Sequence, residues 1–131
     1  MVAINHYSKE DDGTVKLSEN FSVNEFACKD GSDPIFIAPR LVEILQTIHS
    51  NFGQPVMIHS AYRTPLHNAK VGGARKSQHC YGIAADIVVR DVSPSEVAEF
   101  AETLLGDSGG IGRYAEFTHI DVREEKARWN G

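Results

Sequence analysis

Cysteine is scarce in this chain, which has two, Cys28 and Cys80, in 131 residues. Two cysteines are too few for a disulfide framework or for a four-cysteine zinc site. We therefore expect two separate, reduced thiols that are partly buried. Cys80 directly follows His79, so metal binding by its thiol is the alternative, although adjacent side chains of an extended segment point in opposite directions.

Long apolar runs are also absent. No stretch approaches the roughly 20 residues that a membrane-spanning helix needs, and the polar residues 1–10 lack the apolar segment of a signal peptide. We therefore expect that the protein does not insert into a membrane. We also expect that it is made in the cytoplasm, unless the sequence was cut from a longer chain. The net charge of −5 argues against general nucleic-acid binding.

Acidic residues are missing from one long segment, since none lies between Glu43 and Asp86. The same segment carries a group of basic residues, namely Arg63, Lys70, Arg75 and Lys76. An acidic protein therefore has one locally basic region. This region is either a solvated loop or a pocket for an anionic group such as a carboxylate.

The length and the composition, 41% hydrophobic and 24% charged residues, are those of one globular domain with a real core. We expect a single domain over residues 1–131, with residues 1–20 as an irregular N-terminal arm. Ser22 and Glu25 fit a capping box and predict a short helix that ends by Cys28. Turn-forming residues follow over 29–34.

Two longer helices are predicted from apolar residues at helical spacing. The first begins at Pro39 and ends before Gly53, and its apolar face consists of Leu41, Ile44, Leu45, Ile48 and Phe52. The second begins after a capping box at Ser93 and ends near Gly106, and its buried face consists of Val97, Phe100, Ala101 and Leu104.

Alternating patterns predict the strands, and a long loop is expected over residues 61–78. The predicted strands are 54–60, 82–90, 110–114 and 117–123. We expect an α+β fold, in which a mostly antiparallel central sheet made of these strands packs against the two main helices. The charged tail, residues 124–131, has no assignable pattern.

Histidine and carboxylate side chains occur at a spacing typical of a metal site. His79 and Asp86 are seven residues apart, and Asp86 needs a partner or a metal because its strand neighbours are small and apolar. In the last strand His119 and Asp121 share one face. Two histidines and one carboxylate would leave a fourth position for water, as in catalytic zinc sites. We expect His59 to be an ordinary strand histidine.

Several motifs together resemble the zinc D-alanyl-D-alanine carboxypeptidase and L,D-peptidase family, peptidase family M15, and especially its small phage- or bacterium-associated members. The similarity covers roughly residues 18–123. The matching segments are Phe21-Ser22-x-x-Glu25-Phe26, Ser60-Ala61-Tyr62-Arg63-Thr64-Pro65, Ser77-x-His79-x-x-Gly82-x-Ala84-x-Asp86, Gly110-Ile111-Gly112-Arg113-Tyr114 and Phe117-x-His119-x-Asp121. The resemblance implies a fold like that of hedgehog and D,D-peptidase proteins.

The resemblance also implies roles for individual residues. His79, Asp86 and His119 would bind Zn²⁺, and Arg63 would hold a substrate carboxylate or polarise the scissile carbonyl. Ser77 and Tyr81, in the same motif as His79, are expected to contact the substrate.

The general base has two candidates. Some family members place an acid three residues before the third ligand, which here is Glu116. Others share the histidine-x-aspartate pair, which here gives Asp121. Strand alternation puts Asp121 on the ligand face and Glu116 on the opposite face unless the chain bends.

The activity implied by the resemblance is hydrolysis of peptidoglycan stem peptides by a zinc-activated water. We expect a monomer that acts on the cell wall, and a phage or prophage product is the favoured origin. Whether it is a carboxypeptidase or an endopeptidase stays open. One alternative is a zinc-containing module that binds the cell wall without hydrolysis. Another is an α+β binding domain without a metal.

Overall fold

A computed structural model describes residues 2–131, and its centre is a five-stranded sheet. The strands are β3 (Val56–Ser60), β4 (Ala84–Val89), β5 (Gly110–Arg113), β6 (Thr118–Asp121) and β7 (Ala127–Asn130). They lie in the order β3-β4-β6-β5-β7, and all pairs are antiparallel except β5 with β7. The predicted α+β fold with a mostly antiparallel sheet is confirmed.

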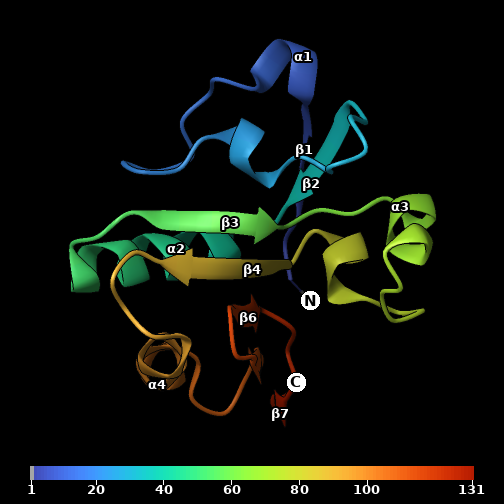
Figure 1. Ribbon diagram of the computed structural model, residues 1–131. Coiled ribbons are helices and arrows are strands. Elements are labelled where there is room, and N and C mark those ends of the chain that lie inside the picture. The colour runs from blue at the N-terminus through green and yellow to red at the C-terminus, as the bar shows by residue number, and fades with distance from the viewer. Residues whose placement is uncertain (1) are drawn as a thin grey trace.

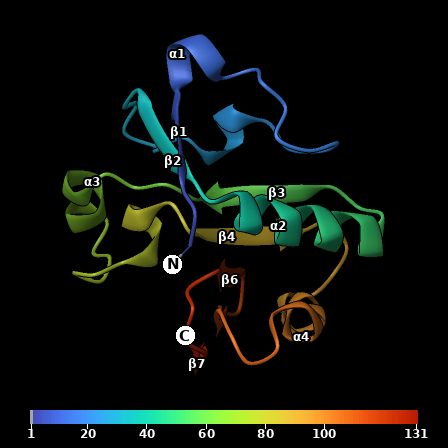
Figure 2. The ribbon, with the colours of Figure 1, turned by 180° about the vertical axis from the view of Figure 1, so that it is seen from behind.

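The two predicted helices are present as α2 (Pro39–Phe52) and α4 (Pro94–Leu105). In both views α2 runs along β3 and β4, while α4 lies beside the strands of the C-terminal half (Figures 1 and 2). The α2 residues that enter the core are Leu41, Val42, Ile44, Leu45 and Ile48. Full burial of each leucine or isoleucine stabilises the fold by about 1.5–3 kcal/mol, so this face fixes α2 on the sheet.

The ends of both helices follow from local chemistry. Pro39 occupies the first turn of α2, and Gly53 ends it with a left-handed φ of 63°. The Ser93 hydroxyl accepts a hydrogen bond from the backbone N–H of Glu96 and caps α4.

Part of the N-terminal arm, residues 5–12, is regular, which corrects the sequence-based expectation for this part; residues 13–20 form no helix or strand. Strand β1 (Asn5–Ser8) pairs antiparallel with β2 (Pro34–Ile37), and one helical turn, α1 (Lys9–Asp12), follows β1. The Asp33 carboxylate accepts hydrogen bonds from the Ser8 hydroxyl and the Glu10 backbone N–H, at 2.8 Å each. The pairing is non-local and β2 is short, so neither strand is evident from local sequence.

The region around residues 61–78 is also more ordered than a loop. It contains α3 (Pro65–Lys70) and leads into a short 3-10 helix, η2 (Gln78–Tyr81). The predicted capping box at Ser22 is present, and it begins another 3-10 helix, η1 (Val23–Phe26). Figures 1 and 2 place α3 at the end of the sheet away from α4.

The charged tail contributes the edge strand β7, which the sequence did not predict. β7 pairs in parallel with β5, and this register sets Trp129 opposite Gly112. The tail therefore brings the chain's single tryptophan to the C-terminal half of the sheet. Within residues 2–131, no helix combines the length and the apolar character needed to cross a membrane.

Candidate metal centre

Two of the predicted metal ligands face each other across neighbouring strands. Asp86 on β4 and His119 on β6 are register partners, and His119 Nδ1 lies 2.9 Å from Asp86 Oδ1. His79 comes from η2, directly before β4, and its Nε2 lies 3.3 Å from Asp86 Oδ2. The structure thus brings together the three ligands predicted from sequence.

The turn between His79 and β4 requires glycine. Gly82 ends η2 with a left-handed φ of 76°, and a Cβ there would meet the Phe36 carbonyl oxygen at 2.4 Å. Any side chain at this position would displace η2 from β2. The glycine of the motif therefore fixes the path by which His79 reaches Asp86.

The geometry of the three ligands fits a zinc ion. One ligand atom from each residue, His79, Asp86 and His119, lies within 4.8 Å of the other two. Tetrahedral zinc with bonds of 2.0–2.1 Å separates its ligand atoms by about 3.3 Å, close to the distances of 2.9 and 3.3 Å found here. All three residues are buried, and a trio of ligands leaves one coordination position open.

Hydrogen bonds on the far side of each imidazole fix which nitrogen faces the site. His79 Nδ1–H donates to the Ala61 carbonyl oxygen at 2.7 Å, so Nε2 faces Asp86. His119 Nε2–H donates to Asp121 Oδ2 at 2.8 Å, so Nδ1 faces Asp86. Such outer contacts orient histidines that bind metals.

Asp121 is wholly buried, and both of its carboxylate oxygens accept hydrogen bonds. Arg123 donates to both of its carboxylate oxygens, at 2.8 and 2.7 Å, in a bidentate pair. A Cβ at Gly110 would meet Asp121 Oδ2 at 2.2 Å, so the carboxylate packs directly on the β5 backbone. Asp121 lies behind His119, away from the open side of the metal site.

The electrostatics of the cluster favour a positive charge between the carboxylates. Burial raises the pKa of Asp86, but hydrogen bonds from His119 and His79 outweigh it and hold that pKa well below the usual range. Burial also raises the pKa of Asp121, and the bonds from Arg123 and His119 outweigh it in the same way. Burial lowers the pKa of His119, yet Asp121 and Asp86 raise it overall. Both acids therefore remain ionised beside His119.

Arg63 lies at the edge of the cluster, as predicted. Its Nη2 is 3.5 Å from Asp86 Oδ2, while its Nε donates to Ser60 Oγ at 3.0 Å and its Nη1 donates to Asn68 Oδ1 at 3.2 Å. Asn68 in turn donates to the Ala74 carbonyl oxygen at 2.8 Å. The guanidinium is therefore held in place beside the site by β3 and α3.

The cluster opens into a pocket of about 500 Å³. Its lining includes Arg63, Ser77, His79, Asp86 and His119, the glycine-rich turn at 71–74 with Lys76, and the side chains of Tyr114, Phe117, Arg123 and Trp129. The ring of Trp129 lies 5.0 Å from that of His119, and the Arg123 guanidinium lies 5.4 Å from the indole. One wall of the pocket is thus basic and glycine-rich, and the other is aromatic.

The remaining predicted site residues differ in their distance from this pocket. Ser77 lines it, and its hydroxyl accepts a hydrogen bond from the His79 backbone N–H at 3.2 Å. Tyr81 is half exposed and lines a neighbouring depression instead. Glu116 is exposed on the turn between β5 and β6, and it does not line the pocket although Phe117 does. Cys80 also belongs to the neighbouring depression and not to the metal cluster.

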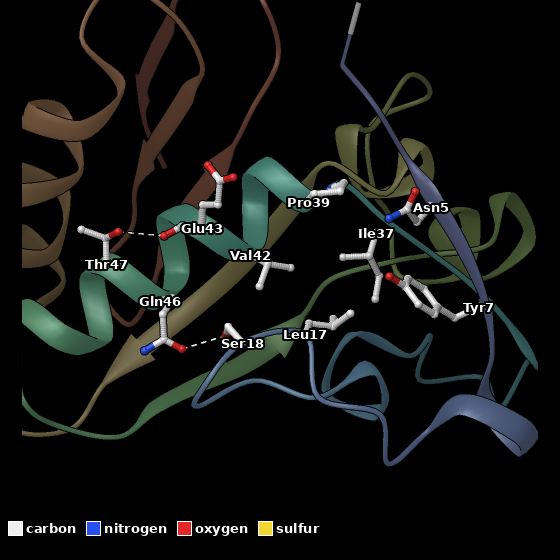
Figure 3. A pocket seen from close by; sticks show the side chains of 10 residues that line it. All are labelled: Asn5, Tyr7, Leu17, Ser18, Ile37, Pro39, Val42, Glu43, Gln46 and Thr47. Carbon is white, nitrogen blue, oxygen red and sulfur yellow. Dashed lines mark hydrogen bonds between the residues drawn. The ribbon is translucent and has the colours of Figure 1, made fainter.

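A second cavity of similar volume, about 500 Å³, lies between α2 and the N-terminal arm (Figure 3). Its wall carries a hydrogen bond from Ser18 to Gln46 at 2.7 Å and the carboxylate of Glu43. No histidine or cysteine lines it. It therefore has no ligand set for a metal, and the candidate active site is the pocket at His79.

Three contributors to the site were missed from sequence. Asn68 and Ser60 orient Arg63, and Trp129 covers His119 from the unassigned tail. Ser60 stood within the quoted arginine motif, so it could have been found. The roles of Asn68 and Trp129 depend on contacts with residues distant in sequence, so no local sequence pattern identifies them.

The sheet and the His-Asp-His cluster at the floor of an open pocket are features of a hydrolase that uses one metal ion. A scan against family models matches residues 18–121 to the peptidase M15 family. This match spans more than half of the chain, so the protein belongs to the peptidase M15 family, and its class is that of a peptidase. A search of curated proteins found no match.

Proposed function

We propose that this peptidase depends on zinc and hydrolyses peptide bonds in peptidoglycan stem peptides. The observation that carries the proposal is the convergence of His79 Nε2, the Asp86 carboxylate and His119 Nδ1 at the floor of a pocket that also contains Arg63. Membership of the peptidase M15 family supports the same chemistry. Zinc held by these three residues would lower the pKa of a water to about 7 and polarise the scissile carbonyl.

Arg63 is proposed to hold the substrate. Its side chain is mostly buried, and contacts with Ser60 and Asn68 leave its Nη2 directed at the metal cluster. A guanidinium fixed in this way can donate to the carbonyl oxygen of the scissile bond or to a terminal carboxylate. Because its position is set before binding, little reorganisation is needed in the transition state.

Asp121 is proposed as a positioning residue, and Glu116 as the general base. Asp121 has no exposed surface, and both of its oxygens accept hydrogen bonds from His119 or Arg123. A buried carboxylate with filled acceptor sites is poorly placed to take a proton from water. Glu116 is exposed, three residues before His119 and beside Phe117 in the pocket wall, so a movement of this turn would bring it to the substrate.

The substrate class follows from the charge and shape of the pocket. Arg63, Lys76 and Arg123 line it, and Asp86 is the only acidic lining residue in the part of the chain that the structure describes. Stem peptides carry several carboxylates, which such a wall attracts. The aromatic wall of Tyr114, Phe117 and Trp129 offers apolar surface to the peptide or the neighbouring sugar. The proposal also includes action on the cell wall by a monomer that is a phage or prophage product.

One observation favours a second function, a zinc-containing module that binds the cell wall without cleaving it. Neither Asp121 nor Glu116 lines the pocket, so within residues 2–131 no carboxylate besides that of Asp86 faces it. A site with the metal but without a base would bind stem peptides and leave them intact.

Incubation of the whole chain with muropeptides and with intact cell walls tests both functions. We expect cleavage to release new amino groups. A chelator should abolish this cleavage, and added zinc should restore it. The His79→Ala variant should be inactive. His59 is an exposed histidine on β3, so the His59→Ala variant should be as active as the unaltered chain. Binding without cleavage would select the second function, and cleavage unaffected by chelator and by His79→Ala would contradict the zinc peptidase.

A further inference from the structure

A second group of metal-ligating side chains lies outside the catalytic pocket. Cys28, Asp30 and His67 each offer one ligand atom, and these atoms lie within 4.8 Å of one another. Cys28 and Asp30 follow η1, while His67 belongs to α3, so residues nearly 40 positions apart in sequence converge here. None of the three lines the pocket at His79.

Thr64 links this group through backbone and side-chain contacts. Its N–H donates to Cys28 Sγ at 3.5 Å, and its hydroxyl donates to Asp30 Oδ2 at 2.9 Å. The same hydroxyl accepts a hydrogen bond from the His67 N–H at 3.2 Å. Thr64 thus contacts the ligand atoms of Cys28 and Asp30, as outer contacts of metal ligands do, and it caps the start of α3, the helix that carries His67.

The orientation of Asp30 is fixed on both sides. Its Oδ1 accepts a hydrogen bond from the Ser32 N–H at 2.8 Å, while its Oδ2 faces Thr64. Cys28 is 2% exposed, so its thiol is held within the fold and not on a mobile surface. The group thus consists of a buried thiol, an exposed carboxylate and a half-buried imidazole.

We propose that Cys28, Asp30 and His67 bind a second zinc ion with a structural role. A thiolate, an imidazole and a carboxylate are a ligand set that zinc accepts, and the two negative charges would balance the charge of the ion. A water molecule would complete the tetrahedron. The ion would join the segment after η1 to α3.

The position of this ion has a consequence for the catalytic pocket. Thr64 directly follows Arg63, whose guanidinium contacts Asp86, and Asn68 in α3 also holds that guanidinium. A zinc ion bound through His67 would therefore fix the element that positions Arg63. The proposal does not depend on peptidase activity, since it concerns metal binding by a separate cluster.

Cobalt substitution distinguishes the two sites, because only the second contains a thiolate ligand. The whole chain, stripped of metal under reducing conditions and titrated with Co²⁺, should bind two equivalents and develop a thiolate-to-cobalt charge-transfer band. Asp30→Asn, at an exposed position, should bind one equivalent and lose the band. His67→Ala should behave likewise, while Cys80→Ser should keep both equivalents and the band.

Zinc content gives the second readout. Dialysed protein should retain two zinc ions per chain, and both Cys28→Ser and Asp30→Asn should retain one. His79→Ala should lose the other ion and keep the charge-transfer band with cobalt, so failure of the catalytic site and failure of this one are separable. A wild-type chain that binds one metal ion without a thiolate band would overturn the proposal, as would an unchanged band in Asp30→Asn and His67→Ala.

Discussion

The two groups of potential metal ligands in this protein are built in opposite ways. His79, Asp86 and His119 are all buried, stand on or next to paired strands, and open into a pocket. Cys28, Asp30 and His67 lie on a turn and a short helix, range from buried to exposed, and line no part of that pocket.

The difference indicates what each group is suited to do. The first group has two histidines and one carboxylate with an accessible fourth position, as expected for a metal that must meet a substrate. The second includes a thiolate and joins separate segments, as expected for a metal that stabilises a loop. Each of the following changes should affect the function of one site and leave the other site intact.

The largest effect is expected for His79→Ala. It removes one of three zinc ligands, so cleavage of stem peptides should fall to the level of the chelator-treated enzyme. Metal analysis should show loss of one zinc ion while the ion at Cys28 remains. Retained zinc and retained cleavage in this variant would show that the histidine is not a ligand.

A large effect on catalysis alone is expected for Glu116→Gln. Loss of a general base lowers kcat by about 10²–10⁴-fold, while zinc content should be unchanged because the residue touches no ligand. Steady-state kinetics on a muropeptide measures the change in kcat. Glu125 is also exposed, so Glu125→Gln is the matched control. An unaltered kcat would remove Glu116 from the mechanism.

A smaller effect of a different kind is expected for Asp121→Asn. The amide has one acceptor oxygen and cannot accept from both His119 and the two Arg123 donors, so His119 is held less firmly and zinc affinity should fall by about 10–100-fold. Competition with a chromogenic chelator measures this affinity, and excess zinc should restore much of the activity. Intact affinity together with a collapsed kcat at saturating zinc would instead identify Asp121 as the base.

The smallest effect is expected for Asp30→Asn, through stability. A ligand at 100 times its Kd stabilises the native state by about 2.7 kcal/mol, so zinc should raise the melting temperature of the unaltered chain more than that of the variant. In the presence of a chelator the two should melt alike. Equal shifts with zinc in both proteins would contradict a site at Asp30.

The convergence of His79, Asp86 and His119 could be predicted from sequence because each residue lies in a local pattern. The alternation of the last strand correctly placed His119 and Asp121 on one face, and the apolar neighbours of Asp86 indicated a buried carboxylate. Alternation gives the direction of a side chain but not its depth or partners. It therefore could not show that Asp121 lies behind His119, paired with Arg123.

The parts that sequence did not predict depend on contacts between distant segments. Strand β1 needs β2 as its partner, and β7 needs β5. The second ligand group needs α3 to meet the turn after η1, and α3 was expected to be part of a loop. Local propensity carries little information on such pairings.

The most direct test of the zinc site is a crystal structure of the whole chain with anomalous diffraction data recorded on both sides of the zinc absorption edge. The account predicts a strong anomalous peak bonded to His79 Nε2, an Asp86 oxygen and His119 Nδ1 at about 2.0–2.2 Å, with Asp121 outside the coordination sphere. A peak bonded to Asp121, or no peak among these three residues in zinc-saturated crystals, would contradict it.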